Sequence, residues 1–200
     1  AVLNQNNHFC YIYNADFMDR KEYENLKGLF NKFQDYTEYF KNEDHPIWEE
    51  VAQKIVEFNP DFVGYFCYTA NVKAVDIVSK KVKQRLPHVK QLTGGPHSTL
   101  DKGLLAKLKY IDYQVIREGE YVTLDIVNGK DLKNLHGVAY RNSLGFIVHN
   151  GDADVLDCDA LPFPERDKFW GLTPKDRQFR VMRILHHDDA QEATAQHLAA

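Results

Sequence analysis

Four short apolar segments, each rich in β-branched and aromatic residues, alternate with helix-like segments along the chain. The four segments are 8–16, 62–68, 88–95 and 111–116. Strands that are buried on both faces have this composition, because helices cover a parallel sheet on either side. The alternation therefore predicts an α/β fold, Rossmann-like in its flavodoxin-like form, with a mostly parallel sheet and helices on both faces.

Helix signals lie between the predicted strands. Pro46 suits the first turn of one helix, Asn71 is a candidate N-cap for the next, and Pro87 would end that second helix. Gly129 is a candidate C-cap for a short helix that follows the last strand. A further single helix is predicted from leucines spaced by four, which are Leu100, Leu104 and Leu108.

The pattern changes after Gly129. In residues 137–151, apolar and polar residues alternate on either side of an Asn-Ser-Leu-Gly turn, which predicts a β-hairpin. Residues 156–176 are rich in Pro, Asp and aromatic residues and predict an extended strap. We expect three parts in the chain. They are a Rossmann-like domain at 1–135, a hairpin and linker strap at 136–176, and the start of a truncated following domain or a disordered tail at 177–200.

Composition narrows the function classes. The 200 residues carry a net charge of −4, and the basic residues form no single run, so nucleic acid is not expected as a partner. No apolar run reaches the roughly 18 residues that a membrane span requires. The three cysteines, Cys10, Cys67 and Cys158, lack metal or disulfide spacing. Buried, reduced thiols in a cytoplasmic protein are the simplest interpretation.

Three polar loops follow the predicted strands. In an open parallel sheet, ligands bind outside the carboxyl ends of the strands, so these loops would meet along one rim. Backbone N–H groups, hydroxyls and carboxylates would gather there and favour ligand binding. The candidate binding residues are Tyr68, Thr69, Ala70 and Asn71 in the first loop, Thr93, Gly94, Gly95, Pro96 and His97 in the second, and Glu118, Gly119 and Glu120 in the third.

Simpler interpretations exist for each of these loops. Gly94 and Gly95 alone could serve only a tight turn, His97 could be a turn histidine bonded to backbone, and Glu120 could be a carboxylate that stabilises a helix start. Neither a G-x-G-x-x-G nor a G-x-x-x-x-G-K-[ST] motif follows any strand, which excludes the common nucleotide sites. No catalytic residue is assigned. The histidines and aspartates at 186–189 are adjacent on a polar segment, where such residues usually face solvent, so no metal site is assigned either.

Four motifs in a fixed order carry a family resemblance. They are "TGGPH" after a strand, "REGE" after the next strand, the hairpin sequence "GVAYR", and the strap sequence "LPFPERD". Over roughly residues 1–183 the chain resembles the cobalamin (vitamin B12)-binding domain at the front of cobalamin-dependent radical SAM enzymes. The resemblance implies that a corrinoid lies across the carboxyl edge of the sheet. The loops at 68–71 and 93–97 would line the cobalamin and its nucleotide tail, and 118–120 would close the rim.

The resemblance also implies partners and chemistry for an intact enzyme. The strap at 161–170 would lead into a radical SAM barrel that holds a [4Fe–4S] cluster and S-adenosylmethionine, and methyl transfer or a related radical step would follow. This chain has no C-x-x-x-C-x-x-C, the motif expected shortly after 180–184, so no activity is expected from the chain alone. We expect a fragment that also lacks the family's first strand, which would leave a gap beside the 8–16 strand unless the sheet is rearranged or pairs with a second copy.

Two departures keep other functions open. The motif D-x-H-x-x-G, whose histidine binds cobalt in some relatives, is absent. Asp44 directly precedes His45, and no glycine stands at the motif's last position. The alternative function is a non-catalytic Rossmann-like docking domain that no longer binds cobalamin, and inward-folded Tyr68 or His97 side chains would favour it. A phosphoacceptor receiver domain ranks lower, because Asp16 stands alone at the end of its strand.

Overall fold

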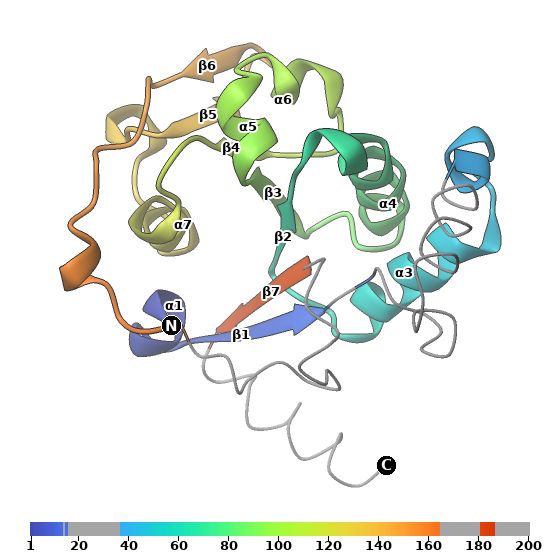
Figure 1. Cartoon of the computed structure of the whole chain (residues 1–200), viewed down its shortest axis with the longest axis horizontal. Coiled ribbons are helices and arrows are strands. Elements are labelled where there is room, and N and C mark those ends of the chain that lie inside the picture. Colours follow the sequence, from blue (N-terminus) through green and yellow to red (C-terminus); the bar gives the residue numbers. More distant parts are fainter. Residues whose placement is uncertain (14, 16–36, 165–180, 187–200) are drawn as a thin grey trace, which may run out of the picture.

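A computed structural model describes residues 1–13, 15, 37–164 and 181–186, the last range by its backbone. Within these ranges one sheet has the strand order β1-β7-β2-β3-β4-β5-β6 (Figure 1). Strand pairing makes β1, β2, β3, β4 and β6 run in one direction and β5 and β7 in the other. The predicted mostly parallel α/β fold is confirmed. The strands are β1 (His8–Tyr13), β2 (Phe62–Phe66), β3 (Lys90–Gly94), β4 (Tyr113–Val115), β5 (Val138–Arg141), β6 (Ile147–His149) and β7 (Val181–His186).

Helices cover both faces of the sheet, as the strand composition predicts (Figure 1). One face carries α3, α4 and α6, and the other carries α1 and α7. Trp48, Val51 and Ile55 of α3 and Val75, Val78 and Val82 of α4 are buried in the larger core cluster. The helices are α1 (Val2–Gln5), α3 (Pro46–Glu57), α4 (Val72–Arg85), α5 (Pro96–Leu100), α6 (Leu104–Lys107) and α7 (Glu120–Val127), with short 3-10 turns η2 (Thr69–Asn71), η3 (Leu132–Asn134) and η4 (Cys158–Ala160).

The prediction of one helix through the spaced leucines is wrong. The chain forms two short helices, α5 and α6, and Leu100 is 79% exposed while Leu104 and Leu108 are buried. Asp101 ends α5, and its carboxylate accepts a hydrogen bond of 3.0 Å from the Gly103 N–H, which turns the chain between the two helices. The hydrogen bond to the Asp101 side chain offers the backbone an alternative to continuing the helix. The spacing of the leucines contains no information about this bond.

The segment at 181–186 joins the sheet instead of standing apart from it. β7 pairs antiparallel with β1 on one side and with β2 on the other, so it occupies the position beside β1. This is the rearranged sheet that we named as an alternative to an open gap. The division into domains at 135 and 176 stays a prediction, and the strap residues 165–180 and the segment 187–200 lie outside the described residues.

The hairpin is formed by β5 and β6, which pair antiparallel through Ala139–His149 and Arg141–Ile147. It extends the sheet beyond β4, since β4 and β5 also pair antiparallel. Residues 150–164 then follow without strand or helix except η4. No helix in the described ranges combines the length and apolar character needed to cross a membrane.

Candidate functional site

The three candidate loops leave the same edge of the sheet. β2, β3 and β4 are neighbouring parallel strands, with Phe66 opposite Gly94 and Thr93 opposite Gln114. Their carboxyl ends therefore lie together, and the prediction of one shared edge is confirmed. We call the residues 67–71, 93–98 and 116–120 at this edge the rim.

The first two rim loops are bonded to each other through their backbones. The Cys67 N–H donates to the Gly94 carbonyl at 2.8 Å, and the His97 N–H donates to the Cys67 carbonyl at 3.0 Å. Gly95 has φ +96°, and a Cβ there would lie 3.2 Å from the Cys67 carbonyl oxygen. A side chain at this position would meet both strain and crowding. Gly95 is therefore required for the close approach, whereas a Cβ at Gly94 would make only ordinary contact at 3.8 Å from Val115.

Asn71 closes the first loop with its side chain. Its carboxamide oxygen accepts from the Tyr68 N–H at 2.8 Å, and its amide nitrogen donates to the Phe66 carbonyl at 2.9 Å. Asn71 occupies the predicted N-cap position of α4, but its side chain makes no capping hydrogen bond to that helix. The amide instead shapes the turn that presents Thr69 and Ala70, both exposed.

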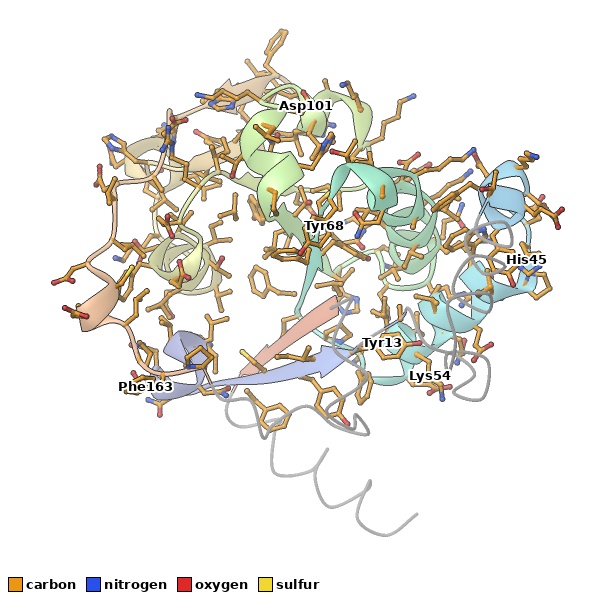
Figure 2. All side chains as sticks on the ribbon, viewed as in Figure 1. Tyr13, His45, Lys54, Tyr68, Asp101 and Phe163 are labelled. Atoms are coloured by element: carbon orange, nitrogen blue, oxygen red, sulfur yellow. The ribbon has the colours of Figure 1, made fainter. Side chains whose placement is uncertain are left out.

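An exposed aromatic pair stands at the end of β2. Tyr68 is 41% exposed and Phe66 is 42% exposed, and their rings meet edge to face with centroids 4.8 Å apart. Figure 2 places Tyr68 near the middle of the view, far from the exposed Phe163 at the periphery. Sequence reasoning missed Phe66, because the residue belongs to an apolar strand that is otherwise buried.

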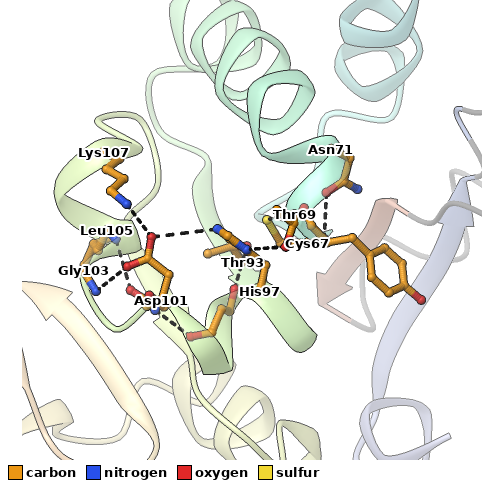
Figure 3. Close-up of polar contacts among 12 residues, drawn as sticks. Cys67, Thr69, Asn71, Thr93, His97, Asp101, Gly103, Leu105 and Lys107 are labelled. Atoms are coloured by element: carbon orange, nitrogen blue, oxygen red, sulfur yellow. Dashed lines mark hydrogen bonds and ion pairs between the residues drawn. The ribbon is translucent and has the colours of Figure 1, made fainter. Parts of the chain in front are cut away.

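His97 links the rim loops through its side chain. Its Nδ1 lies 3.0 Å from the Thr69 hydroxyl, and its Nε2 lies 3.8 Å from a carboxylate oxygen of Asp101 (Figure 3). Asp101 in turn pairs with Lys107 at 2.6 Å. The hydrogen bond from Lys107 holds the pKa of the Asp101 carboxyl below its usual range. His97 thus connects the first two rim loops through its side chain. Asp101, which the sequence analysis did not single out, lies on the other side of the imidazole ring.

The third loop is bonded to α5, the helix that begins in the second loop. Arg117 has φ +64°, and its N–H donates to the Thr99 hydroxyl at 2.9 Å. Glu118 and Glu120 are exposed, and Glu120 lies in the first turn of α7, where the helix dipole favours a carboxylate. The position of Glu120 agrees with its interpretation as a carboxylate that stabilises a helix start. Both carboxylates are also exposed to solvent at the rim.

A buried polar layer supports the rim from below. The Thr93 and Ser98 hydroxyls lie 3.1 Å apart, and the buried Gln114 amide donates to the carbonyls of Ser98 and Asp101 at 2.8 Å each. Burial raises the pKa of the Cys67 thiol, so this cysteine is kept unreactive. The expectation of buried thiols holds for Cys67 but is wrong for the exposed Cys158, while Cys10 is intermediate.

The histidine beside Asp44 has a structural role. His45 precedes α3, and its Nδ1 accepts a hydrogen bond of 3.2 Å from the Ile47 N–H, while its ring lies against Tyr39 with centroids 4.4 Å apart. Among the residues with described side chains, no cluster of three or more His, Cys, Asp or Glu is arranged to hold a metal ion.

Comparison with known families bears on the segment that builds this rim. The family model described as the B12 binding domain matches residues 33–127, which include β2, β3, β4 and all three rim loops. Residues 33–127 thus resemble a B12 binding domain. The resemblance found in the sequence is therefore confirmed for the part of the chain that forms the candidate site.

Relatives of this B12 binding domain occur in longer proteins. An uncharacterized methyltransferase of Pyrococcus horikoshii is 28% identical over 136 residues, or 65% of this chain and 28% of that protein. An anaerobic magnesium-protoporphyrin IX monomethyl ester cyclase of Cereibacter sphaeroides is 26% identical over 68% of this chain and 23% of its own length. The cobalamin-dependent radical SAM methyltransferase TokK of Streptomyces tokunonensis is 31% identical over 50% of this chain and 15% of its own length. The chain thus spans less than a third of each relative.

Proposed function

We propose that the chain is the cobalamin-binding module of a B12-dependent radical SAM enzyme, with methyl transfer or related radical chemistry in the intact protein. The B12 binding domain and the name of one relative, a cobalamin-dependent radical SAM methyltransferase, support this function. The cluster, S-adenosylmethionine and a barrel partner belong to that intact protein. Cytoplasmic location stays a prediction.

The rim supplies groups that suit a corrinoid. A corrin is a flat macrocycle that carries amide side chains and a phosphate-containing tail, and it needs an exposed apolar surface with hydrogen-bonding groups around it. Tyr68 offers exposed aromatic surface, and Thr69 offers a hydroxyl beside it. Glu118 and Glu120 are exposed acceptors for amide donors. The residues present therefore fit the group, which when bound would supply a methyl carrier or a redox-active cobalt.

One observation carries the proposal. The loops at 67–71 and 93–98 are hydrogen-bonded to each other, the loop at 116–120 bonds through Arg117 to Thr99 of α5, and all three loops lie at one edge within the match to the B12 binding domain. In the proposed role, Tyr68–Asn71 and Thr93–His97 line the cobalamin and Glu118–Glu120 close its edge. His97 orients Thr69 from within the rim.

Titration with hydroxocobalamin tests the function. We expect a change in the visible spectrum and co-elution of the corrinoid with the protein on gel filtration. Tyr68→Ala should weaken the affinity by about 5-fold, the order expected for loss of one aromatic contact. Phe146→Ala is the matched control, because Phe146 is 68% exposed at the loop between β5 and β6, which leaves the opposite edge of the sheet. Absence of both spectral change and co-elution would exclude the function.

A second candidate is a docking domain that has lost the ligand. The observation in its favour is His97, whose side chain is only 17% exposed and lies against Thr69 instead of pointing outward. Tyr68, at 41% exposure, argues against it, because its ring is not folded into the protein. The same titration separates the two candidates, since a docking domain would leave hydroxocobalamin unbound.

A further inference from the structure

The segment between the hairpin and the strap lies at the rim edge of the sheet. β6 runs in the same direction as β2, β3 and β4, so the residues that follow His149 emerge at the rim edge. The Asn150 N–H donates to the Val138 carbonyl at 3.0 Å, and the Asn150 amide donates to the Leu135 carbonyl at 3.0 Å. We call residues 150–153 the strap anchor.

The strap anchor is packed as well as hydrogen-bonded. Ala153 is buried against Gly137, where an added Cβ would lie only 2.5 Å from the Ala153 Cβ. The Gly137 carbonyl in turn accepts from the Ile116 N–H at 2.8 Å, at the start of the third rim loop. Residues 150–153, which precede the strap, are therefore part of the same packed unit as that loop.

Asp152 joins this anchor to the third rim loop and to the turn between α5 and α6. One carboxylate oxygen lies 2.7 Å from Lys102 Nζ, between α5 and α6, and the other lies 2.8 Å from Arg117 Nε. The aspartate side chain is 33% exposed, whereas the two cations are more than half exposed. One anion thus spans two cations that lie 15 residues apart in the chain.

Arg117 needs such support because of its backbone. At φ +64° it occupies the left-handed region, which a residue with a Cβ adopts only when its surroundings hold it there. The Thr99 hydroxyl fixes its N–H, and Asp152 fixes its guanidinium. Because Arg117 directly precedes Glu118, its backbone sets the course of the loop at 118–120.

We propose that Asp152 is a positioning residue of the cobalamin site, which acts through Arg117 and Lys102 to hold the third rim loop in its binding conformation. The inference rests on the proposed function and deepens it. Asp152 lies 25 residues beyond the B12 binding domain match, which ends at residue 127, so the strap anchor would contribute to the site from outside that match.

Three variants of the whole chain test this role. Asp152→Asn removes the charge at nearly constant shape, and Asp152→Glu keeps the charge. Asp154→Asn is the matched control. The Asp154 side chain is 91% exposed and lies 3.9 Å from His136, and not beside Lys102 or Arg117. Hydroxocobalamin affinity is measured by titration, and deuterium uptake at 116–120 is measured by hydrogen exchange without corrinoid.

We expect Asp152→Asn to bind hydroxocobalamin about 3- to 10-fold more weakly at low salt, with Asp154→Asn unchanged and Asp152→Glu partly restored. The difference should shrink at high ionic strength, because salt screens exposed pairs. Uptake at 116–120 should rise in Asp152→Asn alone. A general loss of stability would instead raise deuterium uptake throughout the chain and not at 116–120 in particular.

Each contrary outcome has a separate meaning. Equal affinity of Asp152→Asn and the unsubstituted chain would overturn the positioning role and leave the proposed function intact. Unchanged uptake at 116–120 would overturn it as well, because the loop would then hold without the aspartate. Failure of the unsubstituted chain to bind hydroxocobalamin would overturn the proposed function and this inference together.

Discussion

The rim and the tip of the hairpin are both exposed turns, but they are held in opposite ways. We call residues 142–146 the hairpin tip. There the Asn142 carboxamide oxygen accepts from the N–H groups of Leu144 and Phe146 at 3.0 Å each, so the turn is stabilised within a few residues. Each rim loop instead bonds to a segment distant in sequence, as the bonds from His97 to Cys67 and from Arg117 to Thr99 of α5 illustrate.

This difference determines how far a substitution acts. Leu144 and Phe146 are 78% and 68% exposed, and side-chain changes at such positions usually have little effect on stability. A change in one rim loop removes a contact on which another loop depends. The rim is therefore the region where single substitutions should alter both stability and ligand binding.

The largest contrast is expected between two glycines. Gly137 has φ +77° and contacts Ala153, whereas Gly145 of the hairpin tip has φ +82° with nothing within 4 Å of an added Cβ. Gly137→Ala should lower the free energy of unfolding by about 3 kcal/mol, from backbone strain plus overpacking, and Gly145→Ala by about 1 kcal/mol from strain alone. Urea denaturation measures both, and equal losses would contradict the proposed packing beneath the rim.

A smaller contrast is expected between two side-chain amides. Gln114 is fully buried and bonds to Ser98, Asp101 and Leu105, so Gln114→Met should cost about 2 kcal/mol by leaving buried backbone groups unpaired. Asn142→Ala should cost about 0.5 kcal/mol, because water can replace its amide at the partly exposed tip. Chemical denaturation of both variants makes the comparison, and a cost at Asn142 as large as that at Gln114 would break it.

The smallest effect is expected from the ion pair beside His97. Lys107→Gln should lower the free energy of unfolding at neutral pH by about 0.5 kcal/mol, because the exposed ammonium pairs with Asp101. The pKa of Asp101 is depressed in the folded protein, so this contribution is present above the ordinary carboxyl pKa and is lost as the pH falls below about 4.

A double-mutant cycle with Asp101→Asn, measured by denaturation across this pH range, isolates the contribution. Lys107→Gln should have no further effect in the Asp101→Asn background. The Asn142→Ala effect at the hairpin tip should show no such pH dependence, because the amide does not titrate. A Lys107 effect that persists in acid, or in the Asp101→Asn background, would assign it to packing instead.

Much of the sheet could be predicted because its signals are local. β2 at 62–66 and β3 at 90–94 lie within predicted strands, and the parallel order of these strands follows from the helices between them. The shared edge of the three loops follows from that order. The break between α5 and α6 could not be predicted from leucine spacing, because it depends on the Asp101 side chain and on the burial of Leu104 and Leu108.

The contacts within the rim were beyond sequence reasoning for a different reason. Tyr68, Thr69 and His97 were candidates as separate loop residues, but the pairing of Thr69 with His97 joins positions 28 residues apart. Asp101 and Asp152 belong to no motif, and Arg117 entered only as the first residue of "REGE"; the roles of all three depend on distances that no spacing encodes. β7 likewise pairs with β1 through residues at opposite ends of the chain.

The class of fold, the strands that share a direction and the loops that meet at one edge follow from the chain's local patterns, because hydrophobic periodicity and turn residues act over short stretches. Which side chains bridge those loops, why Gly95 is required and how residues 150–153 are held at the rim become clear from the three-dimensional arrangement. Such contacts depend on the relative placement of distant segments, and that placement is set by packing of the whole sheet and its helices.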